Sequence, residues 1–372
     1  MRAPAALARW RGPLAGPLVA ALTVIAAIIA TRHVGLPLRD PDHVAALYFV
    51  LVGCGVAGMV ALDVLLRARA LSQRFPPPRA ALREVRRERW TPGRGLAVAA
   101  AVAGFYLTYM AYRNLKSIVP LLRPGDSFDR QLAALDRDLF AGSDPAVLLH
   151  ALTGSWLPTQ ILSTAYVAFI VFLPLTIGVA LVFARSLRAG LFYTTAQSIN
   201  WVLGAGSYFL LPSLGPIYTF PATFAGLPAS EVTRLQGVLL DQRLDFLRDP
   251  GGSTPQSIAA FASLHISMSF TALLAAYLLG LGPRLKAALW AWFAVTATAT
   301  VHFGWHYVLD DIAGVAMGAA ALGLARVLTG IDPRALRTAR APAVQGARDR
   351  PAVPAGAHVA ASAQDRAPGI AG

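Results

Sequence analysis

The chain has 372 residues, of which 56% are hydrophobic and only 14% are charged, and its mean hydropathy is +0.54. Because a soluble domain normally carries about 25% charged residues, this composition excludes one large soluble core and predicts a polytopic membrane protein. The net charge of +14 would suggest a nucleic-acid partner in a soluble protein. Here the arginines flank apolar runs, so we expect them to serve membrane topology and lipid headgroups, with no nucleic acid involved.

Eight apolar runs approach the length of about 20 residues that a helix needs to cross a bilayer. In chain order they are 13–30, 44–66, 96–112, 159–184, 191–211, 266–281, 287–301 and 312–328. They predict an all-α fold, a polytopic transmembrane helix bundle with about eight spans and a six-helix core. The first run follows Arg2, Arg9 and Arg11, so a cleaved signal peptide is the alternative for that run. The single cysteine, Cys54, excludes an internal disulfide and a cysteine-based zinc site.

Basic residues set the expected orientation. The loop 67–94 is rich in arginine and carries only Glu84 and Glu88 as acids, so positive-inside bias makes it cytoplasmic. It is either a basic amphipathic helix on anionic lipid or a solvated loop. Eight spans then put both termini in the cytoplasm, and the segments 116–158 and 212–265 and the turn around His306 on the outer face.

Three regions follow from this pattern. Residues 1–95 are expected to form two N-terminal transmembrane helices and the basic cytoplasmic loop. Residues 96–330 are expected to form a second membrane domain, which carries the three polar clusters described next. Residues 331–372 are rich in Ala, Pro and Arg with few large apolar side chains, which predicts a disordered cytoplasmic tail.

The first of three polar clusters at the predicted outer ends of spans runs from Lys116 to Pro124. Its lysine and Arg123 could clamp a phosphate, the arginine in bidentate fashion and the lysine as a point charge. The alternative is that both are basic residues snorkelling at a membrane edge. They lie on the side that positive-inside topology disfavours, which supports the functional interpretation.

The second cluster lies where a polar loop enters the sixth apolar run. Ser263 is a good N-cap, and the free backbone N–H groups of a helix start form an anion site. His265, in the first turn, could protonate a leaving oxygen. The alternative is an ordinary cap followed by an interfacial histidine.

The third cluster places His306 and Asp310 four residues apart, which predicts that they share one face of a helix. The carboxylate could fix the imidazole tautomer, and His306 could then attack phosphorus. The alternative is a satisfied buried pair. His302 extends the pattern to a stripe that could bind a divalent ion, so a metal-dependent membrane hydrolase using His302, His306 and Asp310 is a second enzyme hypothesis. It ranks lower because it leaves Lys116 and Arg123 without a role.

The order and spacing of these clusters resemble the type 2 phosphatidic acid phosphatase (PAP2) superfamily. Its first motif, K-x6-R-P, fits Lys116 to Pro124. Its second, P-S-x-H, fits Ser263 and His265 with Ala262 in place of the proline. Its third, S-R-x5-H-x3-D, fits His306 and Asp310.

In that third motif, Ala299 and Thr300 stand where the serine and arginine would be. The departure resembles the inositolphosphotransferase branch of the inositol phosphorylceramide synthase type, whose third motif reads closer to H-Y-x-x-D-x-x-x-G, as from His306 to Gly314. The segment 211–216 also resembles that branch. The resemblance covers residues 96–328.

The resemblance implies a membrane lipid-phosphate phosphatase or phosphotransferase that acts through a phosphohistidine. His306 is the implied nucleophile, Asp310 orients it, and His265 exchanges protons with the leaving and accepting oxygens. Lys116, Arg123 and the backbone near Ser263 would bind the phosphate. The acceptor is water or an alcohol such as inositol, and no cofactor or metal is required.

The expected location is the cell (plasma) membrane, with the active site on the extracytoplasmic face. A non-enzymatic lipid-phosphate binder or transporter is the remaining alternative, because intramembrane histidine and aspartate also occur in proton-coupled carriers. The other acids are expected to be structural. Asp126, Asp129, Asp136 and Asp138 should be solvated or capping residues, and Asp63 should pair with Arg67.

Overall fold

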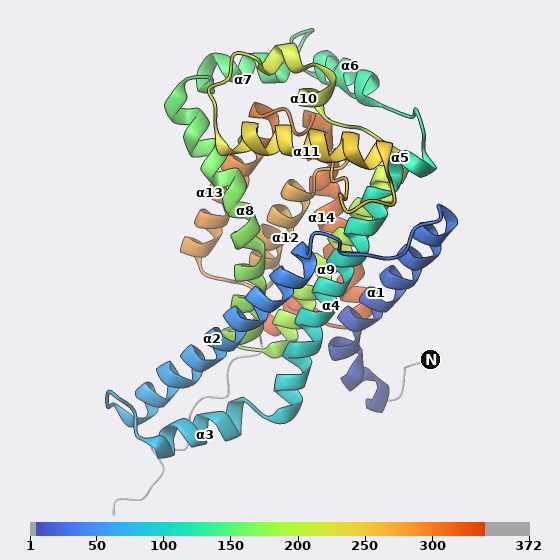
Figure 1. Ribbon diagram of the computed structural model, residues 1–372. Helices are drawn as coiled ribbons and strands as arrows, with labels where there is room; N and C mark the ends of the chain where they lie inside the picture. The colour runs from blue at the N-terminus through green and yellow to red at the C-terminus, as the bar shows by residue number, and fades with distance from the viewer. Residues whose placement is uncertain (1–4, 339–372) are drawn as a thin grey trace, which may run out of the picture. The chain divides into compact units, whose positions relative to one another are not determined.

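Each of the eight apolar runs corresponds to one long helix of the computed structural model, which describes residues 5–338 (Figure 1). These helices are α1 (Ala5–His33), α2 (Val44–Ser72), α4 (Pro92–Ser117), α8 (Trp156–Val182), α9 (Leu187–Leu210), α12 (Leu264–Leu278), α13 (Pro283–His302) and α14 (Val308–Thr329). No strand occurs in the described part of the chain. The predicted all-α polytopic bundle is therefore confirmed.

Five of the eight helices are long and apolar enough to cross a membrane on length and composition alone: α1, α2, α4, α8 and α14. Helix α12 is apolar but only 15 residues long. Helix α9 is less apolar because it lies against α1, α4, α8, α12 and α14, where polar side chains find partners within the bundle. For example, Asn200 on α9 donates to Thr271 (2.9 Å) and accepts from Ser267 (2.5 Å), both on α12.

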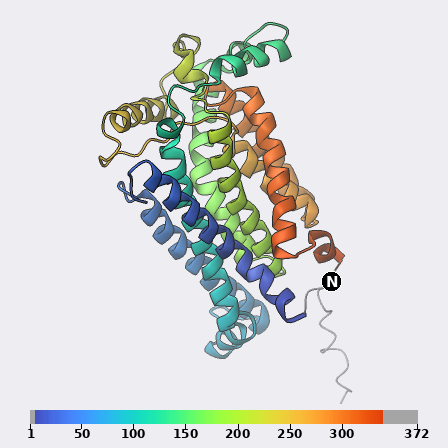
Figure 2. The same ribbon diagram turned by 90° about the vertical axis from the view of Figure 1, so that its right-hand side faces the viewer.

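The N-terminal helices pack directly against the rest of the bundle, with α1 lying along α4 and α9 (Figure 2). The loop between α1 and α2 adds ion pairs and hydrogen bonds to the rest of the bundle. Its Asp40 and Asp42 bind the Arg113 guanidinium of α4 at 2.7 and 2.5 Å. Arg39 donates to the carbonyls of Gly251 and Gly252. Residues 1–95 are thus joined to the predicted catalytic domain by both apolar packing and ion pairs.

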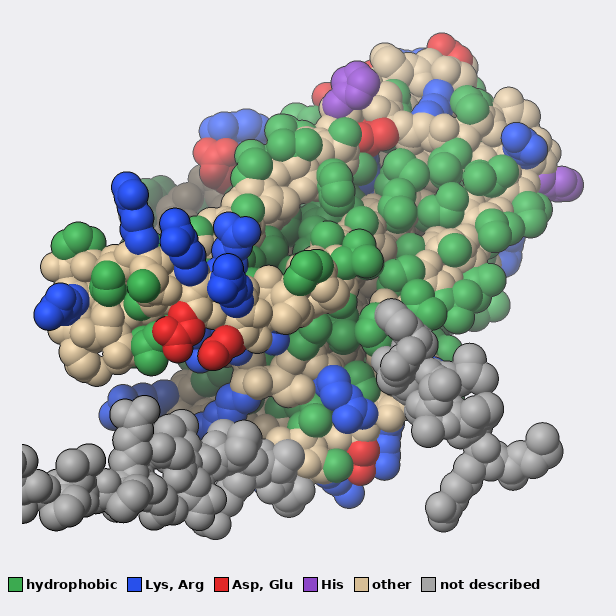
Figure 3. All heavy atoms as spheres, turned by 90° about the horizontal axis from the view of Figure 1, so that it is seen from below, with side chains coloured by type: hydrophobic (Ala, Val, Ile, Leu, Met, Phe, Trp, Pro, Cys, Tyr) green, Lys and Arg blue, Asp and Glu red, His purple; other side chains and the backbone are tan. Residues whose placement is uncertain are grey.

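The basic loop contains an 11-residue helix, α3 (Arg79–Arg89), that packs beside α2. Lys and Arg side chains gather on this end of the bundle (Figure 3). The predicted pair of Asp63 and Arg67 is present at 2.8 Å, and the buried Asp63 also accepts from Arg89 (2.6 Å) and the Trp90 indole (3.0 Å). Three donors therefore satisfy one buried carboxylate.

The two long polar segments fold into further helices that cover the opposite end of the bundle (Figure 1). They are α5 (Val119–Leu122), α6 (Asp129–Leu139), α7 (Pro145–Thr153), α10 (Pro216–Thr219), the 3₁₀ helix η1 (Pro221–Phe224) and α11 (Glu231–Arg248). The predicted tail begins with a further short helix, α15 (Pro333–Thr338). The rest of that predicted tail lies outside the described residues.

Candidate active site

The segment that carries His306 is a turn rather than a helix. Helix α13 ends at His302, the chain reverses at Gly304 with φ of 65°, and α14 begins at Val308. A Cβ on Gly304 would lie 2.4 Å from the Phe224 ring, so the turn requires glycine for both conformation and space. The prediction that His306 and Asp310 share a helical face is wrong, because His306 precedes the helix that carries Asp310.

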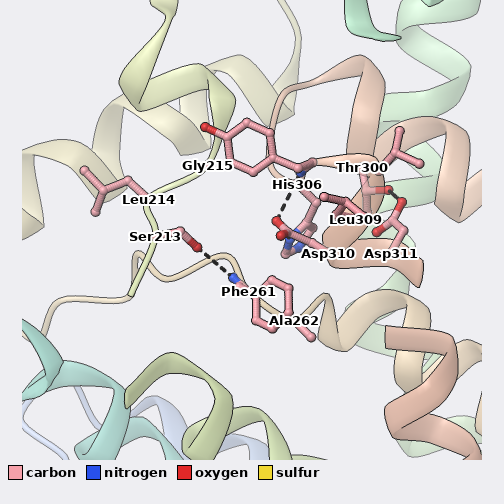
Figure 4. A network of polar contacts seen from close by, with 12 residues as sticks. Ser213, Leu214, Gly215, Phe261, Ala262, Thr300, His306, Leu309, Asp310 and Asp311 are labelled. Atoms are coloured by element: carbon pink, nitrogen blue, oxygen red, sulfur yellow. Dashed lines mark hydrogen bonds and ion pairs between the residues drawn. The ribbon is translucent and has the colours of Figure 1, made fainter. Parts of the chain in front are cut away.

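The pair nevertheless meets, because the turn folds His306 back over the first residues of α14 (Figure 4). The His306 Nδ1 and Asp310 Oδ2 atoms are 3.4 Å apart, and the same oxygen accepts the Tyr307 backbone N–H at 3.0 Å. Both side chains are buried. Burial lowers the pKa of His306 below its ordinary value of 6.5, and the charge of Lys116 acts in the same direction, while the Ala260 carbonyl opposes them. The neutral imidazole is the form that can act as a nucleophile.

His265 approaches the same turn from α12. Its ring centroid lies 6.3 Å from that of His306. Close contact between α12 and α14 brings His265 and His306 together. Glycine at position 314 permits this contact, since a Cβ there would lie 2.6 Å from the Ser263 carbonyl. The Ser263 backbone N–H donates to the Asp310 carbonyl at 3.0 Å. Ser263 itself is fully buried, so it joins the two helices instead of exposing its hydroxyl.

A cavity of about 500 Å³ brings Lys116, His265 and His306 together. Aromatic rings make up much of its wall: Tyr109, Tyr112, Tyr166, Phe169, Trp201, Tyr208 and Trp305. The Lys116 ammonium lies 5.2 Å from the centre of the Tyr208 ring and 5.8 Å from that of Tyr112. A cavity of about 20 Å³ next to Arg39 lies apart from the histidines and is too small to matter for catalysis.

The structure does not bring Arg123 into this cavity. Its guanidinium binds the Asp126 carboxylate at 2.5 Å and the backbone carbonyl of Phe209. The Arg123 guanidinium is therefore neutralised by Asp126 and joins the end of α5 to the end of α9. Helix α4 ends at Ser117, directly after Lys116, and the separate helix α5 lies between Lys116 and Arg123 in the chain.

Position 300, where the resemblance would place an arginine, also lies away from the cavity. Thr300 is fully buried and donates to the Asp311 carboxylate at 2.8 Å (Figure 4). This bond joins the last turn of α13 to the first turn of α14. The Thr300 side chain therefore stabilises the turn between α13 and α14 and does not line the cavity.

Two residues of α6 support the site in a way that the sequence did not indicate. Asp129, fully buried, accepts the backbone N–H groups of Leu214 and Gly215, both at 2.9 Å, and the Tyr307 hydroxyl at 3.1 Å. It thereby joins the loop before α10 to the turn that carries His306.

Asp136, two turns further along α6, accepts from the N–H groups of Val308 (2.7 Å) and Leu309 (3.1 Å), and so caps α14 from another helix. Burial raises the pKa of Asp136, and these two hydrogen bonds oppose that shift. Asp129 and Asp136 lie seven residues apart on the buried face of α6, together with Leu132 and Ala133. An acid repeated on an apolar helical face is the signal that could have identified them.

His302 lies outside the cavity. Its Nδ1 is 2.9 Å from the Thr153 hydroxyl and its Nε2 is 3.2 Å from the Thr159 hydroxyl. Both ring nitrogens are therefore engaged in joining α13 to α7 and α8. The stripe of His302, His306 and Asp310 does not form, because the chain turns between the two histidines. Within residues 5–338 no group of three or more His, Cys, Asp or Glu side chains is arranged to hold a metal.

Comparison with known proteins identifies the family. A family model described as the PAP2 superfamily matches residues 130–324, just over half of the chain. The matched region begins within α6 and contains His265, His306 and Asp310, while Lys116 precedes it. No curated protein and no solved structure matches the chain.

Proposed function

The chain belongs to the PAP2 superfamily. We propose that it is a membrane lipid-phosphate phosphatase or phosphotransferase that works through a phosphohistidine at His306. Family membership supports the phosphatase-type activity on lipid phosphates. The observation that carries the finer assignment is the convergence of Lys116, His265 and His306 on one cavity, with Asp310 behind the nucleophile.

In the first step, His306 attacks phosphorus. With its Nδ1–H donated toward Asp310, His306 would attack through Nε2. A P–N bond forms as the bond from phosphorus to the departing oxygen breaks, and protonated His265 gives that oxygen its proton. Asp310 stabilises the positive charge that develops on the His306 ring.

In the second step, the acceptor attacks the phosphohistidine and His265, now neutral, takes the acceptor's proton. The acceptor is water in a phosphatase and an alcohol, such as inositol, in a phosphotransferase. The P–N bond breaks, and His306 returns to its starting form. Since the same histidines serve both outcomes, access of water or alcohol to the cavity decides between hydrolysis and transfer.

Lys116 supplies the main electrostatic stabilisation of the phosphate. Arg113 also lines the cavity, but Asp40 and Asp42 already bind its guanidinium. The lysine charge is thus the one left for the phosphate oxygens, together with the backbone N–H groups in the first turn of α12. A preorganised charge in a cavity of this kind typically gives one of the larger catalytic contributions.

The proposed setting is the cell membrane, with the cavity on the extracytoplasmic side and both termini in the cytoplasm. The arginine-rich segment around α3 lies at the end of the bundle opposite α6 and α11 (Figure 1). Positive-inside bias would place that segment in the cytoplasm and the histidines outside. Membrane lipids would then surround the apolar helices and supply the substrate.

The test uses purified full-length protein and a panel of lipid phosphates, each with and without inositol or glycerol. We expect product formation and an acid-labile phosphoryl-enzyme, both lost in His306→Ala and retained in the exposed-site control His33→Ala. Release of phosphate alone indicates hydrolysis, and a new lipid product that requires the alcohol indicates transfer. Full turnover by His306→Ala would refute the mechanism, and binding without turnover by the wild type would favour the binder or transporter alternative.

A further inference from the structure

Two aromatic rings stack in series on the His265 imidazole, and a third ring contacts it at a tilt. The ring planes of Trp305 and Tyr166 are nearly parallel, at 4°, with centroids 5.5 Å apart. Tyr166 then stacks on the His265 imidazole at 4.4 Å and 25°. Phe169 contacts the same imidazole at 4.4 Å and 46°. The proposed acid–base histidine thus contacts two rings of α8.

This arrangement replaces the hydrogen bond that usually orients a catalytic histidine. His306 has Asp310, but no side chain or carbonyl among residues 5–338 hydrogen-bonds the His265 ring. Tyr166 and Phe169 are three residues apart, so they project from one face of α8, and both are buried. Rings in fixed contact can define the plane of an imidazole that lacks a polar partner.

The charged form of His265 also needs a stabilising partner. Besides His265, the titratable groups that line the same cavity are Tyr109, Tyr112, Arg113 and Lys116 on α4, Tyr166 on α8, Tyr208 on α9, Glu231 on α11 and His306. Asp310 and Asp311 lie on α14, beside α12. Of these groups, Lys116 and His306 disfavour a positive charge on His265, and Asp310 is directed toward His306. The rings of Tyr166 and Phe169 contact the imidazole, with centroids at 4.4 Å, and the face of an aromatic ring attracts a cation.

We infer that Tyr166 is a positioning residue for the proposed reaction: its ring, with that of Phe169, holds the His265 imidazole toward His306 and stabilises the imidazolium that delivers the proton. This inference rests on the function proposed above. The proton balance is unchanged, since imidazolium gives its proton to the departing oxygen and recovers one from the acceptor. The ring of Tyr166 acts in this scheme, and its hydroxyl is dispensable.

The test compares four variants of the full-length enzyme across a pH series: Tyr166→Phe, Tyr166→Leu, Phe169→Leu and the control Phe293→Leu. Phe293 contacts Phe270 and Trp290 and does not line the cavity. Tyr166→Phe should keep the wild-type kcat. Tyr166→Leu should lower kcat about tenfold with little change in KM, because a desolvated cation–π contact contributes on that order.

The pH profile separates positioning from simple loss of folded protein. In kcat/KM the basic limb reflects loss of the proton from His265. Without the ring the imidazolium is less stable, so that limb should move to lower pH by about half a unit or more in Tyr166→Leu. Phe169→Leu should move it in the same direction, and Phe293→Leu should not move it. A purely structural role would reduce the amount of active enzyme and leave the limb in place.

The inference is overturned if Tyr166→Phe loses as much activity as Tyr166→Leu, or if the leucine variants keep the wild-type limb. If Tyr166→Leu does not fold, the basic limb of Phe169→Leu provides the test, because Phe169 contacts the same imidazole. A wild-type enzyme without turnover or phosphoryl-enzyme would instead defeat the proposed function, so the two failures can be told apart.

Discussion

The Tyr307 hydroxyl donates a 3.1 Å hydrogen bond to Asp129, a residue 178 positions earlier in the chain. Tyr307 directly follows the proposed nucleophile, so this bond connects the catalytic turn to α6, a helix that lies outside the apolar spans. The same carboxylate accepts two backbone N–H groups from residues 214 and 215. One buried side chain therefore sets the relative position of two loops at the cavity.

Asp129→Ala should destabilise the protein by about 3 kcal/mol, because it leaves two backbone N–H groups and a buried hydroxyl without their acceptor. Activity should fall as well, since the turn at Tyr307 loses its anchor. Denaturation of purified protein in detergent measures the first effect. Asp138→Ala, on the exposed side of the same helix, is the matched control and should change stability little. Equal stability of the two variants would contradict this role for Asp129.

Asp136→Ala should fray the first turn of α14. The loss of a capping carboxylate typically costs about 1 kcal/mol, and here it frees the turn that holds Asp310 near His306. We expect kcat to fall while KM changes little. Asp136→Asn retains one acceptor oxygen and should recover part of the activity. Steady-state kinetics on both variants provides the measurement, and a change confined to KM would argue against a capping role.

Lys116 and Arg123 should differ sharply although both belong to the same sequence motif. Lys116→Ala should lower kcat/KM by about 100-fold or more, because it removes a charge from the cavity. Arg123→Ala should have a much smaller effect, since Asp126 and a backbone carbonyl already occupy that guanidinium. Kinetics with one lipid phosphate tests both variants. A larger loss for Arg123→Ala would show that this side chain moves into the cavity during turnover.

The rate of phosphoryl-enzyme formation should show no acid limb near pH 6.5 as the pH decreases from about 7.5 to about 6. Burial lowers the pKa of His306, so the neutral nucleophile persists below the pH at which an ordinary histidine, with a pKa near 6.5, becomes protonated. Lys116→Met removes a charge that contributes to this shift, so the acid limb should move to higher pH. Arg123→Met should leave it in place. Rapid-quench trapping measures the rate, and a fall centred near 6.5 in the wild type would contradict the assignment.

Metal chelators should leave turnover unchanged, because the proposed mechanism requires no metal. His302 uses both ring nitrogens in contacts with threonine hydroxyls. Dialysis against a strong chelator, followed by assay with and without added zinc, tests this expectation. Activity that is lost on dialysis and restored by zinc would favour the metal-dependent hydrolase over the phosphohistidine mechanism.

Local sequence features are enough to predict the membrane-protein class, the eight helices of the apolar runs and the family. Apolar length is a local property, so each run identified its helix without knowledge of the neighbours. The prediction of His265, His306 and Lys116 as partners came from motif order, and all three line one cavity. The pairing of Asp63 with Arg67 is also local, since the two residues are four positions apart on one helix.

The contacts that support the site depend on how distant parts of the chain fold together. Gly304 turns the chain between His302 and His306, so sequence spacing there does not translate into a helical face. Asp126 draws Arg123 away from Lys116. Asp129 and Tyr166 gain their roles from contacts with residues 178 and 99 positions later in the chain, at Tyr307 and His265. Such contacts depend on how helices pack, and helix packing brings together residues whose sequence separation carries no signal.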